Sequence, residues 1–371
     1  GLWHLDTSNG PITARALITA TGQLNRPAWP NLPGRDRFAG ETFHSARWDH
    51  DVDLTGKTVA VIGTGASAIQ FVPEIAKQAK QVLLFQRSAP YVIPKPDRPY
   101  SATEQRLMAR FPLLQKLDRA RVYAQNEARV LGFTSLQGAM RFHEYLFKKH
   151  LRECVPDPDT RAKLTPDYPM GCKRILISND YYQALTKYRI PVITGGVRAI
   201  TADGVEDTDG EHHQADVIIY GTGFQATDFL APMTITGRRG QDLNQAWRDG
   251  AEAYLGITVH GFPNLFMLYG PNTNLGHNSI IYMIESQIAY VVSALETLER
   301  DGHRFVDVRP GVQDDFNRRL QARMRDTVWD QGCESWYKTA SGKNTNNWPG
   351  FTFSYRQRTR HLDPEDYELH P

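Results

Sequence analysis

Residues 58–68 read TVAVIGTGASA, a run of β-branched and small apolar residues that ends in a glycine-rich turn. The run predicts a buried strand over residues 57–62, and the following segments predict a helix over 67–78 and a second strand over 81–86. Gly63 permits a tight turn, Gly65 lets the backbone approach a pyrophosphate, and Ala68 lets the helix pack closely on the strand. The stretch therefore predicts a βαβ unit that holds a dinucleotide at the helix N-terminus.

The turn and the end of its second strand indicate which dinucleotide is bound. The turn residues expected near the phosphates also include Thr64, Ala66, Ser67 and Gln70. Folds that prefer NAD place Asp or Glu about 20 residues after the turn, whereas Arg suits the 2′-phosphate of NADP. Arg87-Ser88 stand there, which favours NADP, with a solvated surface arginine as the alternative. A tight turn without a ligand would need the same small residues, so the glycine motif alone leaves a structural role open.

Whole-chain composition excludes several classes of protein. Hydrophobic residues make up 40% and charged residues 23% of the 371 residues, which is typical of soluble globular proteins. Lys plus Arg number 43 against 41 Asp plus Glu, a balance that favours no nucleic-acid partner and no membrane surface. No apolar run is long enough to cross a bilayer, and three widely spaced cysteines argue against a disulfide framework or a Cys-x-x-Cys metal site. From the chain length we expect two domains or one strongly elaborated domain. We also expect a cytoplasmic location, no membrane insertion and no metal.

A second motif precedes the glycine turn. Phe38, Gly40, His44, Trp48 and Asp49 are spaced as F-x-G-x-x-x-H-x-x-x-W-D. The combination resembles the fingerprint F-x-G-x-x-x-H-x-x-x-W-[P/D] of the flavin-dependent Baeyer–Villiger monooxygenases. Flavin enzymes that oxygenate nitrogen and sulfur carry a similar motif that usually ends in Tyr or Phe, without the acidic or Pro residue after it. The Trp-Asp ending favours the ketone-oxidising branch.

The resemblance implies both a fold and a reaction. The expected fold is α/β, with two dinucleotide-binding, Rossmann-like domains of the flavoprotein monooxygenase type. The implied reaction uses NADPH, FAD and O2 to insert one oxygen atom beside the carbonyl of a small-molecule ketone, through a flavin C4a-peroxide, giving an ester or lactone. An N- or S-oxygenating flavin monooxygenase and a non-catalytic NADP-binding fragment are the alternatives. Neither the ketone nor the oligomeric state can be predicted.

Roles for individual residues follow from the same resemblance. Lys173 and Arg174 lead into an apolar run, so at least one is expected near the interior, where its charge needs an anionic partner, with a surface position as the alternative. Arg174 corresponds to the family's catalytic arginine, which stabilises the anionic peroxide and the tetrahedral adduct. Lys173 and Arg87 correspond to contacts with the NADP 2′-phosphate, and His44 to a structural and conformational histidine. Trp336 looks like a tryptophan near the nicotinamide ribose, with a core tryptophan as the alternative.

Two strands that end in Thr-Gly, over residues 16–22 and 215–223, resemble the paired segments at which two-dinucleotide flavoproteins cross between their FAD and NADP domains. The cofactor-binding residues expected there are Thr21, Gly22, Thr222 and Gly223. A Gly-Pro-Asn loop that ends at Asn272 precedes a helix predicted over 278–300, and the N-terminus of such a helix can face an electron-rich flavin edge.

The predicted domains are the remainder of an FAD-binding domain (1–45), an NADP-binding domain (46–215) with a helical insertion at about 100–165, and a return to the FAD-binding domain with the C-terminal region (216–371). The chain opens on a predicted hairpin that turns at residues 9–11. No strand–glycine–helix unit precedes this hairpin. We therefore expect the first FAD-binding βαβ unit to be missing and the chain as given to be inactive by itself.

Overall fold

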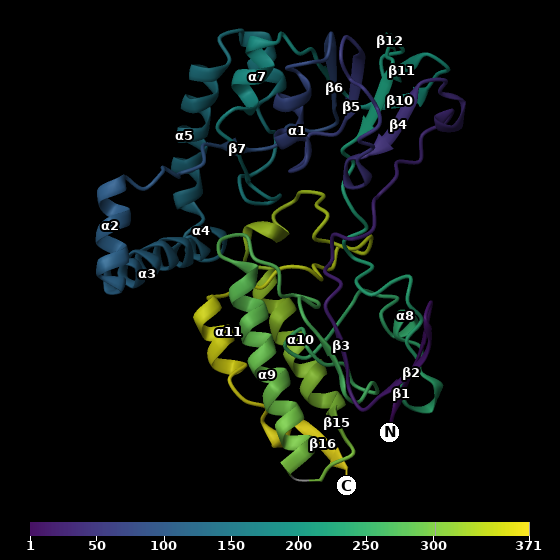
Figure 1. The fold of residues 1–371 in the computed structure, drawn as a ribbon, viewed down its shortest axis with the longest axis vertical. Coiled ribbons are helices and arrows are strands. Elements are labelled where there is room, and N and C mark those ends of the chain that lie inside the picture. Colours follow the sequence, from purple (N-terminus) through teal and green to yellow (C-terminus); the bar gives the residue numbers. More distant parts are fainter. Residues whose placement is uncertain (301, 371) are drawn as a thin grey trace. The chain divides into compact units, whose positions relative to one another are not determined.

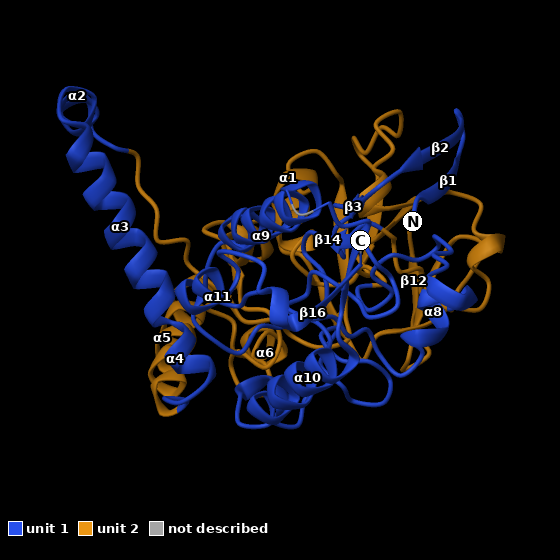
Figure 2. Cartoon of the chain, turned by 90° about the horizontal axis from the view of Figure 1, so that it is seen from below, with its two compact units in different colours: residues 1–25, 100–137, 226–371 blue, residues 26–99, 138–225 orange. Residues whose placement is uncertain are grey.

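The computed structural model describes residues 1–300 and 302–370, which form two compact units (Figure 2). Unit 1 consists of Gly1–Asn25, Tyr100–Gln137 and Ala226–Pro371, and unit 2 of Arg26–Pro99 and Gly138–Gln225. The predicted helical insertion is therefore shared: its first part packs in unit 1 and its second part in unit 2. The predicted domain limits are defined by cofactors rather than by packing, and they stay a prediction.

Unit 2 is built on a five-stranded sheet with the order β4-β13-β5-β6-β9 (Figure 1). All four pairings between these strands are parallel. The strands are β4 (Glu41–His44), β13 (Val217–Tyr220), β5 (Thr58–Ile62), β6 (Gln81–Gln86) and β9 (Val192–Thr194). The central strands β5 and β13 are buried almost throughout, because a parallel sheet is covered on both faces. The strand–turn–strand unit predicted from residues 57–86 lies at the centre of this sheet.

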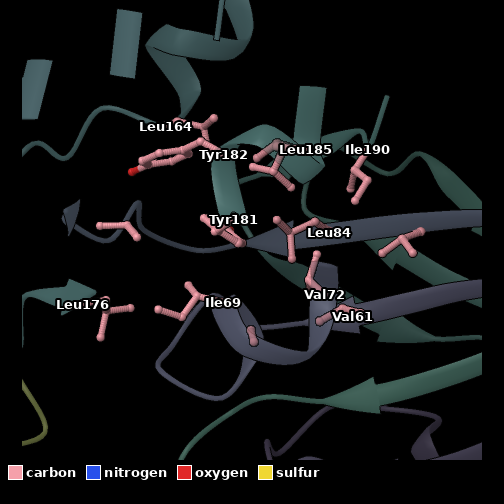
Figure 3. Packing of buried hydrophobic residues seen from close by; sticks show 14 of the residues in the cluster. Val61, Ile69, Val72, Leu84, Leu164, Leu176, Tyr181, Tyr182, Leu185 and Ile190 are labelled. Carbon is pink, nitrogen blue, oxygen red and sulfur yellow. The ribbon is translucent and has the colours of Figure 1, made fainter. Parts of the chain in front are cut away.

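Helices cover one face of this sheet, and a small second sheet covers the other. Val61 and Leu84 on the strands pack in one cluster with Ile69 and Val72 of α1 (Ala68–Ile75) and with Leu185 of α7 (Tyr181–Lys187) (Figure 3). The opposite face packs against the antiparallel strands β10 (Val197–Ile200), β11 (Gly204–Asp207) and β12 (His212–Gln214). The other elements of unit 2 are η1 (Arg35–Arg37), η2 (Ser45–Arg47), β7 (Val92–Ile93), α5 (Gly138–Cys154), α6 (Pro158–Lys163) and β8 (Leu176–Ile177).

Unit 1 brings distant parts of the sequence together around a short parallel pair, β3 (Leu17–Thr19) and β14 (Leu265–Met267). The predicted N-terminal hairpin is present as β1 (Trp3–Thr7) and β2 (Gly10–Ala14). Its helices are α2 (Ala102–Arg110), α3 (Pro112–Ala128), α4 (Val130–Phe133), α8 (Leu243–Ala246), α9 (Ile280–Arg300), α10 (Pro310–Met324) and α11 (Thr352–Arg358). The remaining elements are η3 (Arg238–Gly240), η4 (Val328–Asp330), η5 (Pro364–Asp366) and the antiparallel pair β15 (Phe305–Val308) and β16 (Tyr367–His370). Across the described residues, no helix combines the length and the apolarity that crossing a bilayer requires.

Candidate active site

The glycine turn joins β5 to α1 in unit 2. Gly63 has a φ of 109°, and a Cβ atom there would lie 2.4 Å from the backbone oxygen of Gly221, so a side chain cannot be accommodated. At Gly65, by contrast, a Cβ atom would meet nothing within 4 Å, so the backbone faces open space. Ser67 at the N-cap of α1 makes no capping bond through its side chain. The Ile69 and Gln70 amides bond to the carbonyl oxygens of Gly65 and Ser67, so in the described structure the amides of residues 65–68 are the ones left for a ligand. This geometry fits a pyrophosphate at the helix N-terminus.

Two of the predicted cofactor residues are tied to the turn itself. The Thr64 hydroxyl donates to the Ser88 carbonyl oxygen at 3.3 Å, and the Gln70 amide donates to the Ala66 carbonyl oxygen at 2.6 Å. Both side chains therefore shape the turn, and Ala68 is fully buried against the sheet. In this turn, backbone amides rather than the Thr64 and Gln70 side chains are therefore expected to contact a phosphate.

Cationic side chains gather where β6 ends. Arg87 is exposed directly after the strand, and the next residue, Ser88, accepts a hydrogen bond from Lys173 Nζ at 3.3 Å. The Lys173 ammonium also lies 4.5 Å from the centre of the Tyr168 ring, in cation–π geometry. The fold thus brings Lys173 to the residue pair that sequence spacing assigned to the nucleotide ribose. Two cations at this strand end suit a 2′-phosphate.

Arg174 has a different environment from its neighbour. Lys173 is partly buried, as expected for one of these two cations, whereas the Arg174 side chain is exposed just before β8. In residues 1–300 and 302–370, no hydrogen bond or ion pair engages the Arg174 guanidinium. All of its donors are therefore available to an anion or to a developing negative charge.

The fingerprint residues contribute to packing in unit 2. Gly40 cannot carry a side chain, because a Cβ atom there would lie 2.3 Å from the Asp216 carbonyl oxygen and against the Phe38 ring. Trp48 makes edge contacts with Phe43 of β4 and Phe71 of α1, at 5.1 and 5.3 Å between ring centroids.

Asp49 forms a local turn, in which its carboxylate accepts from the Asp51 amide at 3.0 Å. Together with the packing of Trp48, this turn fixes the connection from β4 to the nucleotide-binding turn.

His44 is completely buried at the end of β4. Its Nδ1 accepts from the Ala46 amide at 3.1 Å, and its ring makes edge contacts with Trp29 and Phe224. Burial is the main reason that the pKa of His44 is lowered from its ordinary value, so the imidazole is neutral at physiological pH. These contacts support the predicted structural role.

The segment around Phe224 is joined to the chain near residue 28. The Thr222 hydroxyl donates to the Ala28 carbonyl oxygen at 2.6 Å, and the Ala28 amide donates to the Gly223 carbonyl oxygen at 2.9 Å. The predicted cofactor residues Thr222 and Gly223 are thus held at the boundary segment of unit 2.

In unit 1, the other predicted cofactor segments meet at one end of the β3–β14 pair. Thr21 and Gly22 follow β3, Tyr269 and Gly270 follow β14, and all four line one small cavity. Ligands of open α/β sheets bind outside the carboxyl ends of parallel strands, which is where this cavity lies. Nothing within 4 Å would meet a Cβ atom at Gly22, so the backbone is open to a ligand there.

Asn272 and Trp336 lie in loops of unit 1. The buried Asn272 amide donates to the carbonyl oxygens of Asn344 and Asn347, at 2.9 and 3.1 Å, so its donor serves to join two loops. Trp336 is only partly buried, unlike the enclosed Trp329 and Trp348. Partial burial is compatible with a ligand contact, and the role of Trp336 stays a prediction.

A buried polar network around Glu127 has no counterpart in the sequence-based predictions, which gave this region only as a helical insertion. The Glu127 carboxylate, near the end of α3, accepts from the amide and hydroxyl of Thr352 and from the side chain of Asn278. The Phe353 amide also donates to it at 3.3 Å, and His277 Nε2 lies 4.0 Å away. The network fastens the helical insertion to the loop before α9 and to the start of α11. No local sequence signal could have located it, because Glu127 lies more than 150 residues from its partners in the chain.

The pH dependence of stability should report on this network. Burial lowers the pKa of His277 from 6.5 to about 4, so the folded state holds a neutral ring while the unfolded state takes up a proton near pH 6.5. Stability is therefore complete above pH 6.5 and declines as the pH falls toward 4, by up to about 3 kcal/mol from this residue. Urea unfolding at a series of pH values measures it. His277→Gln should flatten the profile in this window, the exposed His361→Gln should not, and equal profiles for both variants would contradict the assignment.

Comparison with known proteins agrees with this geometry. Residues 1–131 match the model of the family described as pyridine nucleotide-disulphide oxidoreductase. A Baeyer–Villiger monooxygenase of Pseudomonas aeruginosa is 50% identical, over 99% of this chain and 70% of the relative. One from Streptomyces coelicolor is 43% identical, over 99% of this chain and 71% of the relative. The solved structure of OTEMO with FAD and NADP superposes with a TM-score of 0.87 at 26% identity, over 99% of this chain and 78% of that one.

The nucleotide turn, the cationic strand end and the second strand pair define an oxidoreductase with two Rossmann-like regions, as the sequence predicted. More specifically, the chain belongs to the Baeyer–Villiger monooxygenase family, whose members are flavin-dependent, NADPH-using enzymes. The predicted family, fold class and enzyme class are confirmed. The roles of the individual site residues stay predictions.

Proposed function

We propose that this chain carries the NADPH site and the catalytic arginine of an enzyme that uses NADPH, FAD and O2 to convert a small-molecule ketone into an ester or lactone. One observation carries the proposal: the unengaged Arg174 guanidinium directly follows Lys173, which is held at the end of the nucleotide-binding strand by Ser88. The relationship to enzymes named for this reaction supports the same activity.

Different sets of residues fit the two cofactors. The turn of residues 63–68 would hold the NADPH pyrophosphate through its amides, and Arg87 with Lys173 would hold the 2′-phosphate. In unit 1, Thr21 and Gly22 follow β3, where the open backbone of Gly22 would approach the FAD, and the partly buried Trp336 would lie near the nicotinamide ribose. When bound, the flavin supplies hydride acceptance and the activation of O2.

The protein's own contribution to the oxygenation step is electrostatic. A carbonyl that is attacked by a nucleophile develops negative charge on its oxygen, and preorganised donors lower the barrier to that charge. Arg174 is permanently charged and presents several N–H groups, so it can stabilise an oxyanion without giving up a proton. His44 is buried and neutral, so it supports the fold between the motifs rather than moving a proton.

Product analysis tests this proposal. The chain, extended to the full length of its relatives and loaded with FAD, should convert a cyclic ketone to a lactone with consumption of NADPH. A thioether offered in parallel should yield much less sulfoxide, because an anionic oxidant attacks carbonyls whereas sulfides need an electrophilic one. Preferential sulfoxide formation would favour an S- or N-oxygenating enzyme, and NADPH binding without any product would indicate a non-catalytic NADP-binding protein.

A further inference from the structure

Unit 1 carries a helical arm that takes no part in any core. The arm consists of residues 100–122, which form α2 and the first half of α3, and none of these residues is buried. Figure 2 shows α2 and the first half of α3 extending away from the rest of unit 1. The anchor of α3 lies further along the helix, where Tyr123 bonds to Thr352 at 3.0 Å and Glu127 joins the buried network. The arm is therefore held at one end only.

Large apolar side chains gather around the turn between the two helices of the arm. Their exposed fractions are 45% for Leu107, 52% for Phe111, 65% for Leu113, 41% for Leu114 and 58% for Leu117. Single exposed apolar residues are normal, but a cluster of this density on a projecting element indicates a contact surface.

Cations outnumber acids on the arm, five against two. Glu104 is engaged in a capping box with the Ser101 amide, and the Asp118 carboxylate accepts from Arg121 and from the Tyr100 hydroxyl. Three exposed cations remain, and within the described part of the chain no side-chain hydrogen bond or ion pair engages them: Arg110, Lys116 and Arg119. The arm therefore presents an apolar tip flanked by free positive charge, although the whole chain is nearly balanced at +2.

The exposed apolar side chains and the excess of cations together indicate which kind of partner fits the arm. A second copy of the chain would place free cations against like cations, which opposes pairing through the same surface. An anionic surface that accepts apolar groups complements both features, and anionic lipid headgroups above acyl chains provide it. We propose that the arm is a peripheral docking element that inserts its apolar tip into the interface of an anionic membrane, without crossing it.

Vesicle co-sedimentation of the full 371-residue chain tests the proposal. The chain should partition onto vesicles of phosphatidylcholine mixed with phosphatidylglycerol, and only weakly onto phosphatidylcholine alone. Replacing Lys116 and Arg119 together with alanine should lower partition about 25-fold, because each cation near an anionic surface contributes about fivefold. Replacing Leu113 and Leu117 together with serine should lower it at least about tenfold, through lost apolar insertion.

Matched controls separate docking from general effects on folding. Val292→Ser replaces an exposed apolar residue of α9, and Lys148→Ala removes an exposed cation of α5, so neither should alter partition. All substituted positions are exposed, so helix content by circular dichroism should stay unchanged. Equal partition onto both kinds of vesicle, or none, would overturn the proposal. A drop in the molecular mass of the vesicle-free chain upon the leucine substitutions would show self-association instead, and would overturn it as well.

Discussion

Replacing Arg174 with alanine should lower the rate of ester formation about 10²–10³-fold, the loss seen when one main donor to an oxyanion is removed. The guanidinium is exposed and engaged by no described residue, so its removal should leave the fold and cofactor binding intact. The measurement is the turnover of a cyclic ketone by the protein extended to its relatives' full length, with flavin content determined from the absorbance spectrum.

Two further variants test the role of Arg174. Arg174→Lys keeps the charge but loses the planar set of donors, so its rate should fall between those of the wild type and the alanine variant. Arg152→Ala removes an equally exposed guanidinium from α5 and should leave turnover unchanged. Normal lactone yield from Arg174→Ala would refute the catalytic role.

The second large effect should appear at the end of β6. Arg87→Ala should weaken NADPH binding roughly 10- to 150-fold and leave NADH binding nearly unchanged, because a charge-assisted bond to the 2′-phosphate contributes about 1.5–3 kcal/mol. Fluorescence titration of the chain with both dinucleotides measures the difference. Lys80→Ala, at the opposite end of the same strand, is the matched control and should change neither affinity. Equal losses for NADPH and NADH at Arg87→Ala would remove the 2′-phosphate assignment.

The sequence predicted the central βαβ unit because its determinants are local. An apolar run, a glycine turn and a second apolar run specify β5, α1 and β6 within about 30 residues, as expected for such a unit. The placement of Lys173 beside Ser88 came from resemblance to a known family, since no local pattern joins residues that far apart. The position of β13 between β4 and β5 depends on pairings across the whole of unit 2 and was likewise not predictable from local pattern.

Features that arise only from tertiary packing could not be predicted from the sequence. Glu127 has no motif next to it in the sequence. Its buried carboxylate is satisfied only because the tertiary fold brings Thr352 and Asn278 to it. The cationic arm was hidden for a related reason. The whole chain has a net charge of +2, whereas residues 100–122 alone hold five cations against two acids, and an average over the chain does not show this local excess.

The pairing of β3 with β14 also constrains how the protein is made. Residues 17–19 are synthesised well before their partner strand, residues 265–267. At about 5–20 residues per second, the intervening chain takes roughly 10–50 s to appear. The sheet of unit 2 is complete once residue 220 has emerged, so unit 2 can fold while β3 of unit 1 is still without its partner strand. During this interval β3 of the nascent chain presents unpaired strand edges, which favour misassembly.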